Sequence, residues 1–381
     1  MSLLYLDNAA AMQPSGNLPE RFAELMRQYF VNGEAASLEA FQGRQVLEKA
    51  DEKMLSALLG SDHKAYAFYT NSGTEAVNGA FFFLEEEFAR KKHSGTLFTT
   101  RAEHPAMEKA LERLAEKSSS RIQFLPLDRE GGIDLKKFSD LLAEKANPLL
   151  LAVHHVQSET GRIQDLIALR KILNEKAPSV IFLADTIQSA GKIPIPWKEA
   201  GLDFSFLSGQ KAGCPGGGAI LARKESGKLL SAVRTTNHFI GRCPLPCAIL
   251  LAEIFRELGE KLPENMEKLT RLSQFLREEF ARKVPALKPT LPLTKSSPYL
   301  QHFRTHPFEG AILTRMLGEK KITISAGSAC SSETRDPSPA LLAMGVTAKE
   351  AFGALRISFS GMETKENMIF LADCLRDCME K

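Results

Sequence analysis

Residues 202–218 read LDFSFLSGQKAGCPGGG, in which a short apolar segment leads to a lysine and then to a glycine-rich turn. The alternating pattern of residues 202–207 predicts a strand, and Ser208 and Gln210 place polar groups directly before Lys211. A partly desolvated lysine loses its proton more easily and becomes a nucleophile toward a carbonyl carbon. The glycines that follow allow the backbone to approach a ligand closely. A surface lysine before a turn is the alternative interpretation.

Predicted strands and helices alternate on both sides of this stretch, from about residue 65 to residue 223. Strands are expected at residues 65–69, 96–100, 121–127, 149–155 and 180–184, with helical patterns between them. Such alternation predicts an α/β fold in which a mostly parallel sheet is covered by helices on both faces. Open sheets of this kind bind ligands at the carboxyl ends of their strands.

Three of the predicted strands end in residues that suit a ligand site. Residues 70–75, TNSGTE, would open a helix through a glycine and hydroxyl groups, an arrangement that cradles phosphate. A plain Ser or Thr helix cap explains the same residues. His104 and Asp185 follow two other strands. A buried Asp185 requires a cation, which is either a protonated heterocycle nitrogen or a structural Arg or Lys.

The C-terminal part of the chain carries a second group of candidate residues. Cys330 lies in GSACSS, a small polar loop where a reactive thiol would be accessible. Arg356 interrupts the apolar strand pattern of residues 354–359, where it pairs with an acid or binds a ligand carboxylate. We expect a large domain at residues 17–255 and a small domain formed by residues 1–16 and 256–381.

The composition limits the classes of function. The chain has 381 residues, of which 44% are hydrophobic and 25% charged, and a net charge of +3. This weak charge favours neither nucleic acid nor an anionic membrane as a partner. The sequence shows no signal peptide and no apolar run long enough to cross a bilayer, so we expect a cytoplasmic protein.

The six cysteines favour free thiols over a disulfide framework in a chain of this kind. Cys243 and Cys247, like Cys374 and Cys378, are spaced to share one face of a helix. A zinc site built from these pairs is one alternative, but buried thiols in helices are commoner, and we predict no metal.

Taken together, the motifs resemble those of the NifS/IscS-like cysteine desulfurases, which belong to the class V group of fold-type I pyridoxal phosphate enzymes. The resemblance spans nearly the whole chain and keeps the motifs in family order. It rests on seven segments: LDNAA (6–10), TNSGTE (70–75), EHPA (103–106), ETG (159–161), DTIQ (185–188), SGQK (208–211) and GSACSS (327–332).

The resemblance implies a pyridoxal 5′-phosphate cofactor held as a Schiff base by Lys211. Asp185 would keep the pyridine nitrogen protonated, and His104 would stack on the ring and assist proton transfer. Substrate binding would fall to Asn8 and Arg356. The remaining implied cofactor contacts are the phosphate ligands Gly73, Thr74, Ser208 and Gln210, and the ring-oxygen contacts Gln188 and Ser158.

Several positions depart from the family pattern. Gln157 and Ser158 stand where the family has two asparagines, and Gln210 stands where it has a histidine before the lysine. The family's Arg-Ser-Gly-Thr segment has its nearest counterpart in GRCP at residues 241–244, where Arg242 would contact an anion. The segment after Asn32 lacks the family's histidine.

The implied function is a homodimeric cysteine desulfurase. It would convert L-cysteine to L-alanine, leave a persulfide on Cys330, and pass the sulfur to an acceptor or scaffold protein for iron–sulfur clusters or thiolation. The alternatives are a class V aminotransferase, a selenocysteine lyase, and a catalytically weak family member that acts as a binding partner in sulfur transfer. An aminotransferase has no need of a thiol in the loop that holds Cys330.

Overall fold

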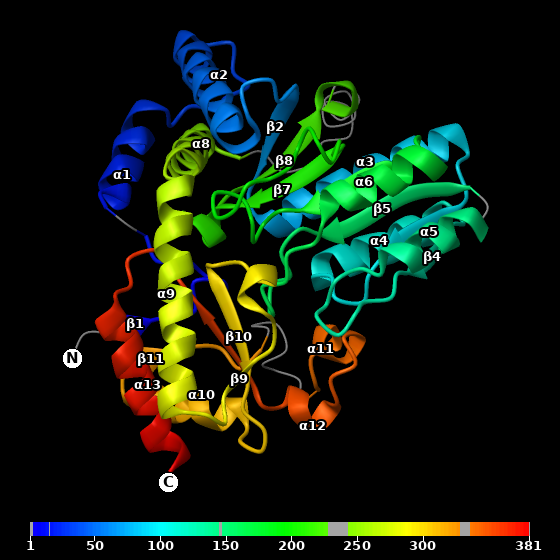
Figure 1. Ribbon diagram of the computed structural model, residues 1–381. Helices are drawn as coiled ribbons and strands as arrows, with labels where there is room; N and C mark the ends of the chain where they lie inside the picture. The colour runs from blue at the N-terminus through cyan, green and yellow to red at the C-terminus, as the bar shows by residue number, and fades with distance from the viewer. Residues whose placement is uncertain (1–2, 15, 145–146, 228–242, 328–335, 381) are drawn as a thin grey trace.

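The computed structural model describes residues 3–14, 16–144, 147–227, 243–327 and 336–380. Its largest sheet has seven strands in the order β2-β8-β7-β6-β5-β3-β4 (Figure 1). The strands, in that order, are Ala65–Thr70, Gly218–Arg223, Phe204–Ser208, Ile181–Asp185, Pro148–His154, Thr96–Thr99 and Arg121–Phe124. All neighbours pair in parallel except β8, which is antiparallel to both β2 and β7. The predicted fold class is therefore confirmed.

The central strands are buried on both faces because apolar side chains alternate between two core layers. In β6, Phe182 packs into one layer and Leu183 into the other. One layer contains residues of α3 (Gly73–Lys91) and α4 (Pro105–Lys117). The opposite layer contains residues of α2 (Leu38–Leu59), α5 (Leu135–Glu144), α6 (Leu166–Lys176) and α8 (Leu245–Glu260), while α1 (Leu18–Gln28) lies beside α8.

A smaller unit follows α8 and includes the N-terminal strand. Its antiparallel sheet has the order β12-β10-β9 (Ala354–Ser358, Leu300–Arg304, Lys288–Pro289). Separately, β1 (Leu4–Tyr5) pairs in parallel with β11 (Ile322–Thr323). Its helices are α9 (Leu262–Lys283), α10 (Gly310–Glu319), α11 (Pro339–Ala343), α12 (Ala348–Ala351) and α13 (Lys365–Met379), with a short 3₁₀ turn η2 (Leu293–Lys295). A second 3₁₀ turn, η1 (Gly209–Ala212), belongs to the seven-stranded part and follows β7.

The N-terminal segment joins the smaller unit through its side chains as well as its strand. Leu6 is fully buried in the same apolar core as Leu276 of α9 and Ile357 of β12. Residues 4–6 thus pack with the C-terminal part, while the division into domains stays a prediction. The boundary drawn at residues 255 and 256 lies inside α8 and remains a prediction.

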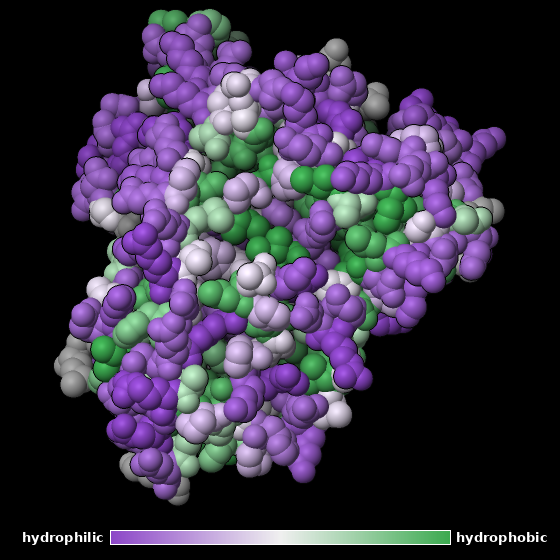
Figure 2. Space-filling model, viewed as in Figure 1, coloured by the Kyte–Doolittle hydropathy of each residue, from purple (hydrophilic) through white to green (hydrophobic). Residues whose placement is uncertain are grey.

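The two units meet across the middle of the molecule. In the view of Figure 1, the long helix α9 runs from the seven-stranded part to the smaller unit. Figure 2 shows hydrophilic residues over most of the rim of this face and hydrophobic residues near its centre. Within the residues described, no helix is both long and apolar enough to cross a membrane.

Candidate functional site

A cavity of about 490 Å³ lies where the two units meet. Its walls come from the carboxyl ends of the parallel strands, the residues after β1, and β12 of the smaller unit. It collects ten of the twelve residues predicted for the site: Gly73, Thr74, His104, Ser158, Asp185, Gln188, Ser208, Gln210, Lys211 and Arg356. Cys330, the eleventh, lies outside the described residues, as does Arg242.

Lys211 enters the cavity from a tight turn after β7. The strand ends at Ser208, and η1 follows at once. A side chain at Gly209 would place its Cβ 2.1 Å from the carbonyl oxygen of Gly216, so the turn requires glycine there. The Lys211 Nζ donates a hydrogen bond to the carbonyl oxygen of Ala10. The amine is therefore held between the turn and the N-terminal segment.

The opposite corner of the cavity is the N-terminus of α3. Ser72 caps the helix by accepting a hydrogen bond from the Glu75 N–H at 3.1 Å. Gly73 packs so closely that an added Cβ would lie 2.8 Å from the Ser208 Cβ. Free N–H groups of a first helical turn, together with hydroxyl groups, favour an anion. The cap interpretation and the anion interpretation of TNSGTE are both compatible with this geometry.

Asp185 ends β6 and lies deep at the carboxyl edge of the sheet. It is 8% exposed, and its Oδ1 accepts a hydrogen bond from the Ile187 N–H at 2.9 Å. Burial raises the pKa of the carboxyl group, while that hydrogen bond and His104 lower it. Among the described residues, no Lys, Arg or His nitrogen lies within 4.0 Å of its oxygens. A cationic group in the cavity would therefore stabilise this carboxylate.

His104 occupies the edge of the same cavity as the cap of α4. Its Nδ1 accepts a hydrogen bond from the Ala106 N–H at 3.1 Å, so a neutral ring carries its proton on Nε2. The imidazole is exposed, unlike the carboxylate of Asp185. It can cover a flat ligand and exchange a proton with it.

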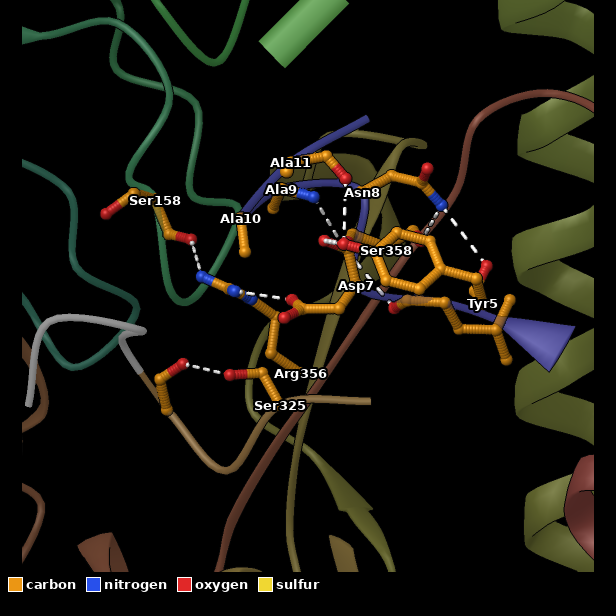
Figure 3. Close-up of polar contacts among 12 residues, drawn as sticks. Tyr5, Asp7, Asn8, Ala9, Ala10, Ala11, Ser158, Ser325, Arg356 and Ser358 are labelled. Carbon is orange, nitrogen blue, oxygen red and sulfur yellow. Dashed lines mark hydrogen bonds and ion pairs between the residues drawn. The ribbon is translucent and has the colours of Figure 1, made fainter. Parts of the chain in front are cut away.

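Arg356 brings the smaller unit into the site (Figure 3). It is 2% exposed, and its Nη2 lies 2.6 Å from Asp7 Oδ1. Its Nη1 donates to the carbonyl oxygen of Ser158 at 2.9 Å, whereas its buried Nε has no hydrogen-bond partner. The guanidinium is thus fixed in place at the cavity wall. A fixed guanidinium suits recognition of a carboxylate.

Asn8 is the predicted site residue that the structure keeps out of the cavity. Its side chain is 1% exposed and donates to the Ser358 carbonyl oxygen at 3.0 Å, while its Oδ1 accepts from the Gln13 N–H. These bonds tie the N-terminal segment to β12. Its neighbours Ala9 and Ala10 line the cavity instead. The Asn8 side chain therefore does not line the cavity here, and the substrate contact expected of it stays a prediction.

The departures from the family pattern have local explanations. Gln157 supports its own loop, because its Oε1 accepts from the N–H groups of Glu159 and Thr160 and its Nε2 donates to the Ala102 carbonyl. Ser158 lines the cavity and gives its carbonyl oxygen to Arg356. A side-chain contact from Ser158 to a cofactor ring stays a prediction.

Three polar groups near the cavity were not anticipated from the sequence. Asp7 holds Arg356, as described above. Glu103 Oε1 lies 3.0 Å from His154 Nδ1, in a buried pair behind His104. Lys192 contacts Gln188 and is 3% exposed. Both Asp7 and Lys192 lie within or next to the motifs, but nothing in the sequence pairs them with residues of the site.

The other cysteines give no sign of a metal centre. Cys374 and Cys378 lie on α13 and are buried in the apolar core of the smaller unit, whereas Cys247 lies on α8. The described residues contain no group of three or more His, Cys, Asp or Glu side chains that could hold a metal ion.

The cavity fits pyridoxal 5′-phosphate by the chemistry of its donors. A helix N-terminus with Gly73 and Ser208 suits the phosphate, and the buried Asp185 suits a protonated pyridine nitrogen. Lys211 lies in the wall between them and provides an amine for the aldehyde. The cofactor itself supplies an electron sink for bonds at the α-carbon of an amino acid.

Comparisons with known proteins agree with this assignment. A cysteine desulfurase IscS of Clostridium botulinum is 27% identical over 386 residues, covering 98% of this chain and 93% of that protein. A cysteine desulfurase of Nostoc sp. is 26% identical and covers 100% of this chain and 94% of its own. Among solved structures, a NifS-like protein superposes with a TM-score of 0.85 at 22% identity, over 99% of both chains. A NifS-like protein from Rickettsia africae gives 0.83 at 21% identity over the whole of both chains.

The family model for aminotransferase class V matches residues 4–243, which include every cavity-lining residue of the large unit. This confirms the resemblance drawn from the motifs. The chain belongs to the aminotransferase class V family, whose enzymes use pyridoxal 5′-phosphate.

Proposed function

We propose that this protein is a pyridoxal phosphate-dependent cysteine desulfurase that converts L-cysteine to L-alanine and holds the sulfur as a persulfide on Cys330. The main support for this proposal is that Arg356 is fixed at the wall of the cavity that Lys211 and Asp185 also line. A guanidinium, which suits a carboxylate, thus lines the same cavity as the amine and the buried acid. The cysteine desulfurase relatives, which match over nearly the whole chain, support it.

The role that we propose for each residue follows from its place in the cavity. Lys211 would hold the cofactor through its amine and would carry a proton to or from the substrate carbon. Asp185 would hold a proton on the pyridine nitrogen, and the α3 N-terminus with Thr74 would bind the phosphate. Arg356 orients the substrate through its carboxylate. His104 covers the ring and accepts or returns a proton through Nε2.

The sulfur step needs a thiolate. The Cys330 sulfur attacks the substrate sulfur, so an S–S bond forms while the substrate C–S bond breaks. The carbon gains a proton and becomes the methyl group of alanine. Cys330 thus gains one sulfur atom, and no external oxidant or reductant is consumed. The persulfide is then available to a sulfur acceptor.

The test is alanine release from L-cysteine with a thiol reductant present, for the wild type and for Cys330→Ser. The proposal expects alanine from the wild type and none from the variant. Cys247→Ala is the matched control, since burial raises the pKa of the Cys247 thiol and it does not line the cavity; it should keep activity. Alanine from both wild type and Cys330→Ser would favour a lyase, and transamination products an aminotransferase. Absence of turnover with cofactor bound would favour a sulfur-transfer binding partner.

We also infer that the protein is a cytoplasmic homodimer with a sulfur-acceptor or scaffold partner. Large apolar side chains near the N-terminus are exposed, among them Phe30 (75%), Leu38 (65%) and Phe41 (50%). A grouping of this kind is typical of a surface that another protein covers. Light scattering of the purified protein should give twice the mass of one chain, and a monomer would contradict the inference.

A further inference from the structure

Lys192 is a buried cation beside the cavity that the mechanism above does not use. It lies between β6 and β7, is 3% exposed, and is not among the residues that line the cavity. Its Nζ donates to Gln188 Oε1 at 3.4 Å. Gln188 does line the cavity, so Lys192 reaches the site through that side chain.

Lys192 forms no ion pair with an acidic residue in the described part of the chain. Among the described residues, no carboxylate oxygen lies within 4.0 Å of its Nζ. Burial and, to a smaller degree, the positive charges of Lys211 and Arg356 together lower its pKa to about 7. A buried, unpaired ammonium costs free energy, which a nearby anion offsets.

Gln188 is held at both ends of its amide. Its Nε2 donates to the Ala9 carbonyl oxygen at 2.9 Å, and its Oε1 faces the ammonium of Lys192. A carbonyl oxygen only accepts and an ammonium only donates, so the amide has one orientation. The second N–H of Nε2 is then left for an acceptor in the cavity.

We propose that Lys192 is a positioning residue: it orients the Gln188 amide toward the ring oxygen of pyridoxal phosphate and adds buried positive charge that favours the ionised form of that oxygen. The proposal rests on the assignment of this cavity to the cofactor, as the proposed function does. It does not depend on which amino acid is the substrate.

The experiment compares Lys192→Met with the wild type by three measurements: the melting temperature of the cofactor-free protein, the cofactor dissociation constant, and the absorbance maximum of the bound cofactor. Met keeps the length of the side chain and removes the charge. We expect cofactor binding about tenfold weaker, the range of one hydrogen bond to a charged group, with a shifted absorbance maximum. We expect the melting temperature of the cofactor-free protein to stay the same or rise, because a buried unpaired charge has gone.

Two further variants separate positioning from packing. In a Gln188→Leu background, Lys192→Met should weaken binding less than in the wild type, because the amide that it orients is absent. Lys283→Met is the control: that partly buried lysine pairs with Asp373 at 2.7 Å and with Glu279, far from the cavity lining. It should lower the melting temperature and leave cofactor affinity unchanged.

Unchanged affinity and absorbance in Lys192→Met would overturn the proposal. A lower melting temperature of the cofactor-free protein without a change in affinity or absorbance would also overturn it, because Lys192 would then be structural. A wild type that binds no cofactor would overturn both this proposal and the proposed function. A wild type that binds cofactor but releases no alanine would remove the desulfurase function alone, and the binding measurements would still decide the role of Lys192.

Discussion

The two sides of the cavity are built in different ways. On the side that we assign to the cofactor, Asp185 is the last residue of β6 and Lys211 lies in the turn directly after β7, so one strand end and one turn place these groups. On the side that we assign to the substrate, Arg356 is held by Asp7, 349 positions away along the chain, and by Ser158, 198 positions away. The first side depends on local structure, whereas the second depends on how the two units meet. Substitutions on the two sides should therefore have different measurable effects.

Lys211→Ala should have the largest effect, on the cofactor side. The visible absorbance of the attached cofactor should disappear, and activity should fall by about 10²–10⁴-fold or more, because the attaching amine and proton carrier are both lost. Lys198→Ala, at an exposed ion pair with Asp62, is the control and should match the wild type. An unchanged spectrum in Lys211→Ala would remove Lys211 from its role.

Substitution on the substrate side should affect substrate binding and folding together. Asp7→Asn removes the carboxylate that pairs with the buried Arg356 guanidinium at 2.6 Å, so we expect a loss of about 3 kcal/mol of stability and a raised KM. The cofactor spectrum should be retained. Chemical denaturation and steady-state kinetics measure the two effects. A normal KM with normal stability would contradict the role given to this ion pair.

Gly73→Ala tests the packing at the N-terminus of α3, where we propose that the phosphate binds. The new Cβ would lie 2.8 Å from the Ser208 Cβ, so we expect a cost of about 1–3 kcal/mol and weaker cofactor binding. KM for substrate should change little. The matched control is Gly318→Ala in α10, where a Cβ meets nothing within 4 Å and stability should hold or rise. Equal cofactor affinity in both variants would argue against close packing at Gly73.

The last prediction concerns how the stability of the cofactor-free protein depends on pH. The pKa of Lys192 is lowered from 10.5 to about 7 on folding, so between these values the unfolded chain binds more protons. The contribution of Lys192 therefore makes the free energy of unfolding rise with pH across this window. The destabilisation caused by its buried charge is greatest below pH 7. The stability difference between Lys192→Met and wild type should shrink as pH rises from 7 toward 10. A constant difference across that range would contradict the depressed pKa.

The difference between the two sides of the cavity also explains which site residues can be predicted from the sequence. Lys211, Asp185, His104 and the TNSGTE segment stand directly after strands with clear apolar patterns, and parallel topology brings the strand ends together. The partners of Arg356 are not encoded by spacing, because they depend on packing between units. The side-chain partners of Asn8, Ser358 and Gln13, likewise cannot be read from its motif, because Ser358 lies 350 positions away along the chain.

The attachment of the cofactor to Lys211 is tested most directly by reducing the cofactor-loaded protein with borohydride and mapping the modified peptide by mass spectrometry. Reduction fixes the cofactor to the amine that holds it. We expect one modified residue, Lys211, in the turn after β7. Modification of Lys192, or an unmodified protein despite bound cofactor, would contradict the role of Lys211.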